Sequence, residues 1–303
     1  MKRTVLALVL ALSFSLANAQ EVSFGYVEWP GVTVKTHVAS EILSTLGYDT
    51  EMSSLSVPLV LRGVANGDLD AFLGVWVPSM NGMVDPYLDD GSVTQVAVNL
   101  NETVYRPAVP TYVYEAGVTS LADLTAYNEQ FEQDFYAIEP GNDGNQIMLD
   151  AVANGTYGLS DWDIVESSTE AMLAAVGRAT DRDEWIVFLA WSPHWMNAVY
   201  DIRYLDDPEG IWGSDGYVAT VMNTESAEAM PNVSLFLSQL QVTPDMQNLW
   251  INRYSRQGQD PAEVASTWIS ENLDVVLQWA DGVTTASGEP ASDVLSARFA
   301  TSE

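Results

Sequence analysis

The sequence contains no cysteine, which excludes disulfide bonds and thiolate metal sites. Basic residues are also scarce: 11 lysines and arginines stand against 42 aspartates and glutamates, for a net charge of −31. Lys35 is the only lysine beyond Lys2. This balance argues against nucleic acid or an anionic membrane surface as a partner. We interpret the acidic excess as a source of solubility in a salty medium.

Long hydrophobic runs are missing, apart from one at residues 5–16. That run is too short to span a bilayer, which needs about 20 apolar residues. It follows Lys2 and Arg3 and precedes a small-x-small pattern at 17–19, so residues 1–19 are predicted to be a signal peptide cleaved before Gln20. We therefore expect an exported, periplasmic protein without direct membrane insertion.

The rest of the chain alternates between short apolar segments and segments with helical spacing, which predicts an α/β fold with mostly parallel sheets flanked by helices. Strands are expected at 22–28, 50–55, 70–76, 135–138, 163–167 and 185–191. Helices are expected at 33–46, 57–65, 146–153, 170–178, 234–240, 261–271 and 273–280. The polar stretch after Gly282 is expected to be partly loose.

Three of the ten tryptophans stand out because each closes an apolar strand segment next to a proline: Trp29, Trp76 and Trp191. Ligands of open α/β sheets bind at the carboxyl ends of strands. We therefore expect these three rings to meet in a cleft. Four others fall in helical or turn segments and are interpreted as packing residues: Trp162, Trp250, Trp268 and Trp279.

Clustered aromatic rings suit a trimethylammonium group, which carries a diffuse positive charge and no hydrogen-bond donor. Ring faces attract the charge through their quadrupole, and each desolvated contact contributes about 2 kcal/mol. Sugar stacking is the competing use of such rings. It needs surrounding carboxamides and charged donors, and the strand-end turns are poor in these.

Four blocks resemble the choline and glycine betaine binding proteins of ABC importers: 26–29 (YVEW), 72–78 (FLGVWVP), 138–145 (IEPGNDGN) and 188–194 (FLAWSPH). The resemblance covers nearly the whole chain after residue 19. It implies a two-lobed periplasmic binding protein with the ligand between the lobes, acting as a monomer with a membrane permease. We place lobe 1 at 20–107 plus 213–303 and lobe 2 at 108–212.

The same resemblance implies that Trp29, Trp76 and Trp191 are cage rings, that Tyr105 is a fourth and that Asn142 is a polar ligand contact. From the residues alone, the alternative for Tyr105 is a packed strand aromatic, and the cage is the favoured interpretation.

Two departures from the choline-binding relatives concern the identity of the ligand. Gly31 stands where those relatives carry an acidic residue, and Val75 replaces a polar one. A ligand with its own acceptor oxygen then fits better, held by the N–H groups of Gly31 and Val32 at a helix start or by His194. Since no carboxylate clamp is evident, trimethylamine N-oxide is favoured slightly over glycine betaine, and choline is the alternative.

Two other functional classes are alternatives. A hydrolase would need a nucleophile, base or metal, but the only histidines are His37 and His194, and no HExxH or GxSxG motif occurs. A ligand-sensing partner of a chemoreceptor would use the same cage and remains open. No cofactor is expected. Structural Ca²⁺ binding by the acidic segments 85–90 and 161–163 also remains open, with no ligands assigned.

Overall fold

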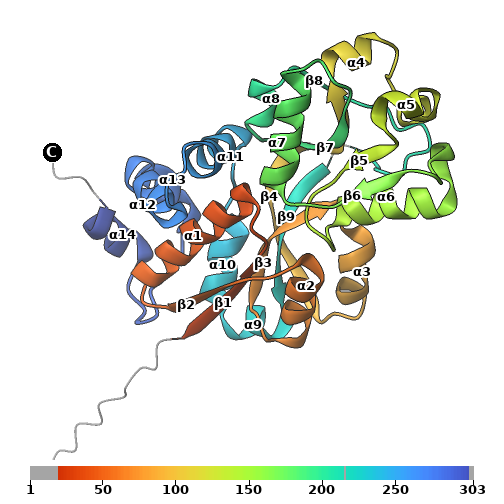
Figure 1. The fold of residues 1–303 in the computed structure, drawn as a ribbon. Coiled ribbons are helices and arrows are strands. Elements are labelled where there is room, and N and C mark those ends of the chain that lie inside the picture. The colour runs from red at the N-terminus through yellow and green to blue at the C-terminus, as the bar shows by residue number, and fades with distance from the viewer. Residues whose placement is uncertain (1–19, 215, 300–303) are drawn as a thin grey trace, which may run out of the picture.

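A computed structural model of the protein describes residues 20–214 and 216–299 (Figure 1). The strands are β1 (Glu21–Tyr26), β2 (Asp49–Ser54), β3 (Ala71–Val77), β4 (Val93–Pro110), β5 (Asp134–Tyr136), β6 (Asp163–Val165), β7 (Val187–Ser192), β8 (Ile202–Tyr204) and β9 (Gly216–Asn223). The predicted signal peptide, residues 1–19, lies outside the described residues.

Helices follow or cover these strands. They are α1 (Pro30–Thr45), α2 (Val57–Asn66), α3 (Asn81–Asp89), α4 (Thr111–Glu115), α5 (Asn128–Phe131), α6 (Asp143–Asn154), α7 (Thr169–Thr180), α8 (Met196–Val199), α9 (Thr224–Ala229), α10 (Pro231–Gln239), α11 (Pro244–Ile251), α12 (Pro261–Glu271), α13 (Leu273–Trp279) and α14 (Ala291–Phe299). Two 3-10 segments and one π-helical segment complete the set: Leu121–Tyr127, Thr156–Gly158 and Asn252–Arg256.

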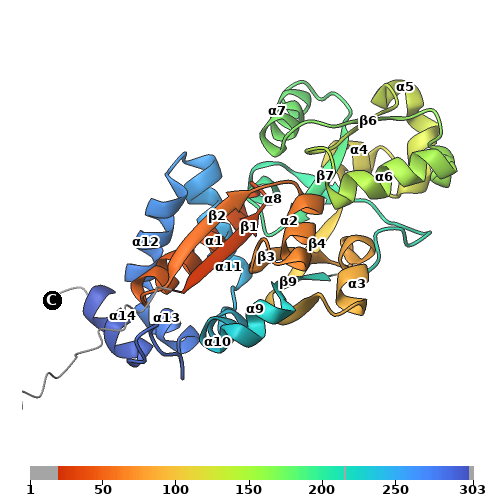
Figure 2. The ribbon, with the colours of Figure 1, turned by 90° about the horizontal axis from the view of Figure 1, so that it is seen from below.

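All nine strands belong to one curled sheet in the order β2-β1-β3-β9-β4-β7-β5-β6, with β8 paired to β4. The pairs β1–β2, β1–β3, β5–β6 and β5–β7 are parallel, whereas β9 and β4 run antiparallel to their neighbours. Strand β4 links the two halves: its residues up to Thr103 pair with β9, and those from Val104 onward pair with β7 and β8. The result is two α/β lobes joined through a shared strand (Figures 1 and 2).

Helix α1 positions one wall of the space between the lobes. It begins at Pro30, where the fixed φ of proline suits the first helical residue. Val34, Val38 and Ile42 recur at intervals of four and are fully buried, so one stripe of the helix packs on the sheet and on α11 and α12. The chain then reverses at Gly47, whose φ of 89° lies in the left-handed region that favours glycine.

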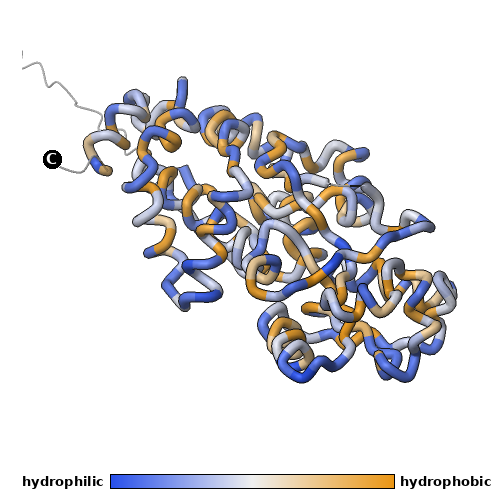
Figure 3. The backbone as a smooth tube through the Cα atoms, turned by 90° about the horizontal axis from the view of Figure 1, so that it is seen from above, coloured by the Kyte–Doolittle hydropathy of each residue, from blue (hydrophilic) through white to orange (hydrophobic). Residues whose placement is uncertain are grey.

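The buried apolar residues form two clusters. One is continuous through both halves of the sheet and includes residues from Val27 to Val221. The other lies between α1, the first strands and the C-terminal helices, and contains Trp250, Trp268 and Trp279. Hydrophobic stretches accordingly alternate with hydrophilic loops along both lobes (Figure 3).

The α/β class predicted from the sequence is confirmed, and all thirteen expected strands and helices occur within a few residues of their expected bounds. Several elements were not anticipated: the strands β4, with 18 residues, β8 and β9, and the helices α3, α4, α5, α8, α9 and α11. The expectation of a loose tail after Gly282 was wrong in part. Helix α14 forms there because Ala291, Leu295 and Phe299 bury an apolar stripe against the C-terminal helices.

Candidate ligand-binding site

A pocket opens where the two lobes meet, at the carboxyl ends of β1, β3 and β7, the position where open α/β sheets bind ligands. It encloses about 420 Å³, part of it open to solvent. Twelve residues line it: Trp29, Pro30, Gly31, Val32, Trp76, Tyr105, Ile138, Asn142, Asp143, Trp191, Gln247 and Ile251. Seven of the eight site residues named from the sequence are among them, all but His194.

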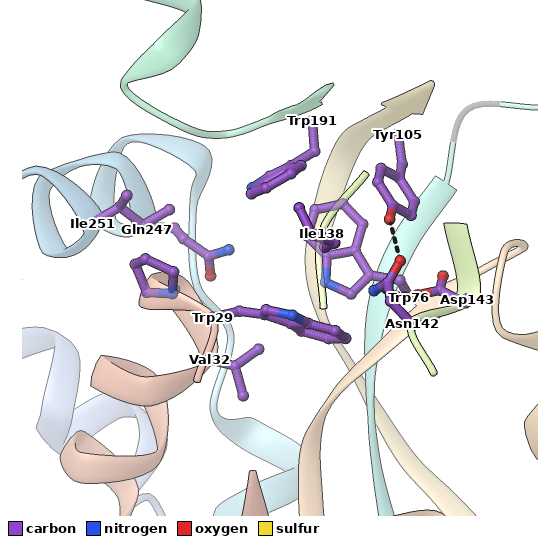
Figure 4. A pocket seen from close by; sticks show the side chains of 12 residues that line it. Trp29, Val32, Trp76, Tyr105, Ile138, Asn142, Asp143, Trp191, Gln247 and Ile251 are labelled. Atoms are coloured by element: carbon purple, nitrogen blue, oxygen red, sulfur yellow. Dashed lines mark hydrogen bonds between the residues drawn. The ribbon is translucent and has the colours of Figure 1, made fainter. Parts of the chain in front are cut away.

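The aromatic rings of the pocket come from four separate segments, and Tyr105 stands among them (Figure 4). Tyr105 on β4 is directly paired with Trp191 on β7, which sets their ring centroids 6.1 Å apart at an angle of 81°. Its ring is 5.8 Å from that of Trp76. A further ring, Trp212, packs edge-on against Tyr105 at 5.3 Å but does not line the pocket. The rings therefore support one another at fixed angles.

Asn142 fixes the position of Tyr105. As N-cap of α6, its Oδ1 accepts the backbone N–H groups of Gly144 at 2.8 Å and Asn145 at 3.3 Å. The same oxygen accepts the Tyr105 hydroxyl at 2.8 Å. A Cβ at Gly144 would approach that hydroxyl to 2.2 Å, so only glycine leaves room for it. Much of the hydrogen-bonding capacity of Asn142 is thus committed to the helix and the tyrosine.

The indole of Trp29 joins the two lobes. Trp29 precedes α1 in the lobe that contains β1, and its Nε1 donates to Oε1 of Glu139, in the loop after β5 of the other lobe, at 2.7 Å. Burial raises the pKa of the Glu139 carboxyl, and the bond from Trp29 partly offsets this rise. The ring plane of Trp29 consequently has a fixed orientation beneath the pocket.

Gly31 and Val32 lie in the first turn of α1, whose backbone N–H groups have no partner within the helix. No side chain caps this end. The turn therefore offers donors to a ligand oxygen at the positive end of the helix dipole.

Asp143 adds a negative group to the pocket wall. Its side chain is fully buried, and Oδ1 accepts from Nδ2 of Asn142 at 3.0 Å. Burial raises the pKa of the carboxyl from 3.8 to about 6. At neutral pH the group is therefore mostly ionised and complements a cationic head group.

His194 has a different place from the one expected. It packs edge-on against Trp191, with ring centroids 5.1 Å apart, and lies outside the pocket lining. Its Nδ1 accepts the backbone N–H of Met196 at 3.1 Å. Burial lowers the pKa of the imidazole to about 3, so the ring is neutral and supplies no positive charge to a ligand carboxylate.

Sequence reasoning missed Asp143, Gln247, Ile251, Ile138 and Pro30 in the lining. Pro30 and Asp143 directly follow Trp29 and Asn142, and that adjacency was a usable signal. Gln247 and Ile251 come from α11, and nothing in their local sequence points to a pocket.

Across 20–214 and 216–299, no three His, Asp or Glu side chains are grouped so as to hold a metal ion. Each helix in the same ranges falls short of the length and apolar character that a bilayer crossing requires.

Two α/β lobes with a pocket between them define the periplasmic binding protein class. The chain is similar over its length to an ABC-transporter choline binding protein in complex with choline, with a TM-score of 0.90, 35% identity and coverage of 92% of this chain and 98% of that one. Lactococcal OpuAC, closed around glycine betaine, gives a TM-score of 0.77 at 28% identity and coverages of 86% and 99%.

Sequence comparison agrees. The glycine betaine/carnitine transport binding protein GbuC of Listeria monocytogenes is 34% identical over 176 residues, which are 56% of this chain and 58% of that protein. A family profile matches residues 20–271. The chain belongs to the OpuAC family, the substrate binding domains of ABC-type glycine betaine transport systems.

Proposed function

We propose that this protein is an exported periplasmic monomer that captures a small methylated amine in an aromatic cage and delivers it to the permease of an ABC importer. The observation that carries the proposal is the convergence of Trp29, Trp76, Tyr105 and Trp191 on one pocket. Each ring contributes about 2 kcal/mol to holding a desolvated trimethylammonium group. Three or four such rings give micromolar affinity or better after the cost of association.

The charges around the pocket favour trimethylamine N-oxide slightly over glycine betaine. Its lining contains no basic side chain, and Asp143 is mostly ionised at neutral pH. The carboxylate of glycine betaine would lie near this negative charge without a cationic partner. The oxide needs fewer polar partners, and the free N–H groups of the first turn of α1 supply them. Choline remains the alternative, since a choline binding protein is among the similar structures.

Isothermal titration calorimetry with trimethylamine N-oxide, glycine betaine, choline and carnitine tests both levels of the proposal. We expect heat of binding with at least one of them and the highest affinity for the oxide. If the protein binds none of the four ligands, the proposed aromatic cage is wrong. If choline binds most tightly, only the proposed order of ligand preference is wrong.

Replacing Trp76 tests the cage itself. We expect Trp76→Ala to weaken binding by about 30-fold or more, because about 2 kcal/mol is lost with the ring. Trp76→Phe keeps a ring face and should lose much less. Circular dichroism of the free proteins confirms that the fold is retained. Equal affinity in wild type and Trp76→Ala would show that the ring does not hold the ligand.

A further inference from the structure

Gln247 enters the pocket from the C-terminal helices, far in sequence from the other lining residues. It belongs to α11 and is only 2% exposed. Its amide group points into the space between Trp29 and Trp191 (Figure 4). It therefore lies among the rings rather than on the outer surface of its helix.

This position depends on the glycine at residue 31. A Cβ built there would lie 2.7 Å from Nε2 of Gln247 and 2.9 Å from its Cδ, closer than real Cβ contacts allow. Any side chain at residue 31 would displace the amide. The position of Gln247 therefore depends on Gly31, because the glutamine amide occupies the volume that a side chain at residue 31 would fill.

The Gln247 amide has an oxygen without a partner within the described part of the chain. Its Oε1 is buried without a hydrogen bond to the protein. Buried polar groups are paired in the great majority of cases, and an exception calls for a partner outside the protein. Since the amide borders the pocket, that partner is a molecule bound in it.

We infer that Gln247 is a specificity-determining residue whose Nε2 donates a hydrogen bond to the oxygen of the bound methylated amine. This rests on the proposed function, because the rings must first hold the head group. A neutral amide offers an N–H without placing a negative charge beside an oxide or carboxylate. Its Oε1 can likewise accept from a ligand hydroxyl, so the amide favours ligands that carry an oxygen over ligands that carry none.

The test uses three ligands that share the head group and differ in the oxygen. Tetramethylammonium has none, trimethylamine N-oxide has an acceptor and choline has a hydroxyl donor. We expect Gln247→Met, which has similar length, to weaken binding of the oxide roughly tenfold, as for loss of one hydrogen bond, and to leave tetramethylammonium within about twofold. Gln247→Glu, nearly isosteric but an acceptor only, should weaken the oxide further and improve choline. Gln241→Met, at an exposed glutamine, is the control.

The outcomes separate this inference from the proposed function. If wild type binds none of the three ligands, the cage fails and the inference fails with it. If wild type binds them but Gln247→Met weakens tetramethylammonium as much as the oxide, Gln247 only packs, and the inference alone is overturned. An unchanged order of oxide and choline in Gln247→Glu overturns it as well.

Discussion

Two groups of tryptophans show how one residue type serves two purposes in this molecule. The pocket tryptophans are Trp29, Trp76 and Trp191. The core tryptophans are Trp250, Trp268 and Trp279. Exposure hardly distinguishes them, at 7–9% in the pocket and 0–4% in the core. What differs is the surroundings of the ring faces.

The core tryptophans cover one another. Trp268 meets Trp250 edge-on at 5.0 Å and stacks on Trp279 at 5.4 Å and 20°. The pocket tryptophans have no such mutual contact. Trp76 and Trp191 each pack against Tyr105, and all three pocket tryptophans border the pocket, which is partly open to solvent. A near-buried ring with a face toward a pocket is available to a ligand, whereas a ring whose faces meet other rings contributes to stability.

The largest expected effect comes from truncating one ring of each group. Trp268→Ala should lower the free energy of unfolding by about 3–5 kcal/mol, because it leaves a cavity between two packed rings. Trp191→Ala should cost less stability, since one of its faces borders the pocket, but should weaken ligand binding about 30-fold. Urea unfolding measures the first quantity and calorimetry the second.

Each variant is the control for the other. Trp268→Ala protein that remains folded should bind the ligand like wild type. The comparison would break down if truncating Trp268 weakened binding as strongly as truncating Trp191, because the core tryptophans would then act on the pocket.

A smaller effect, on the pH dependence of stability, arises from a carboxyl group of the pocket. Burial raises the pKa of Asp143 from 3.8 to about 6, so between these values the folded protein holds a proton that the unfolded chain has released. This stabilisation is complete below about pH 4 and is lost as the pH rises through about 6. Each pKa unit corresponds to about 1.4 kcal/mol, which makes the total loss on the order of 3 kcal/mol.

Asp143→Asn removes this contribution, so the difference in unfolding free energy between wild type and variant should change over pH 4 to 7. Asp150→Asn, at an exposed aspartate of the same helix, corrects for the general effect of removing one negative charge. A constant difference between wild type and Asp143→Asn over this range would mean that the carboxyl is not desolvated.

The strands and helices were predictable from the sequence wherever the pattern of buried and exposed residues stays regular along the whole element. Strand β3 is an unbroken apolar run, and α12 has a clear helical spacing with its N-cap at Asp260. Strand β4 escaped prediction because register shifts at Gln95/Ala97, Val98/Leu100 and Leu100/Thr103 break the alternation of inward and outward residues. Its partner β9 depends on β4 for much of its pairing and was missed with it.

The site residues were predictable where residues that are close in the sequence line the pocket together. Trp29, Gly31 and Val32 lie together because they begin one helix, and the block 138–145 carries Asn142 into the pocket. Gln247 could not be found this way, since only the packing of α11 against α1 brings it to Gly31. Proximity along the chain also misled, because His194 follows Trp191 by three residues yet packs outside the pocket.

The smallest expected effect concerns the indole N–H groups. In the pocket, Nε1 of Trp29 donates to Glu139 at 2.7 Å, whereas Nε1 of the core residue Trp250 is buried without a partner. An unpaired buried donor costs about 1–3 kcal/mol, so Trp250→Phe removes that cost while losing some packing. We expect its unfolding free energy to stay within about 1 kcal/mol of wild type. Trp162→Phe removes the 3.0 Å hydrogen bond that Nε1 donates to Asn128, so this variant should be about 1 kcal/mol less stable than Trp250→Phe.

Urea unfolding measures both variants. An equal loss of unfolding free energy in the two would mean that the Trp250 donor has a partner after all, and the two groups of tryptophans would then differ only in the surroundings of their ring faces.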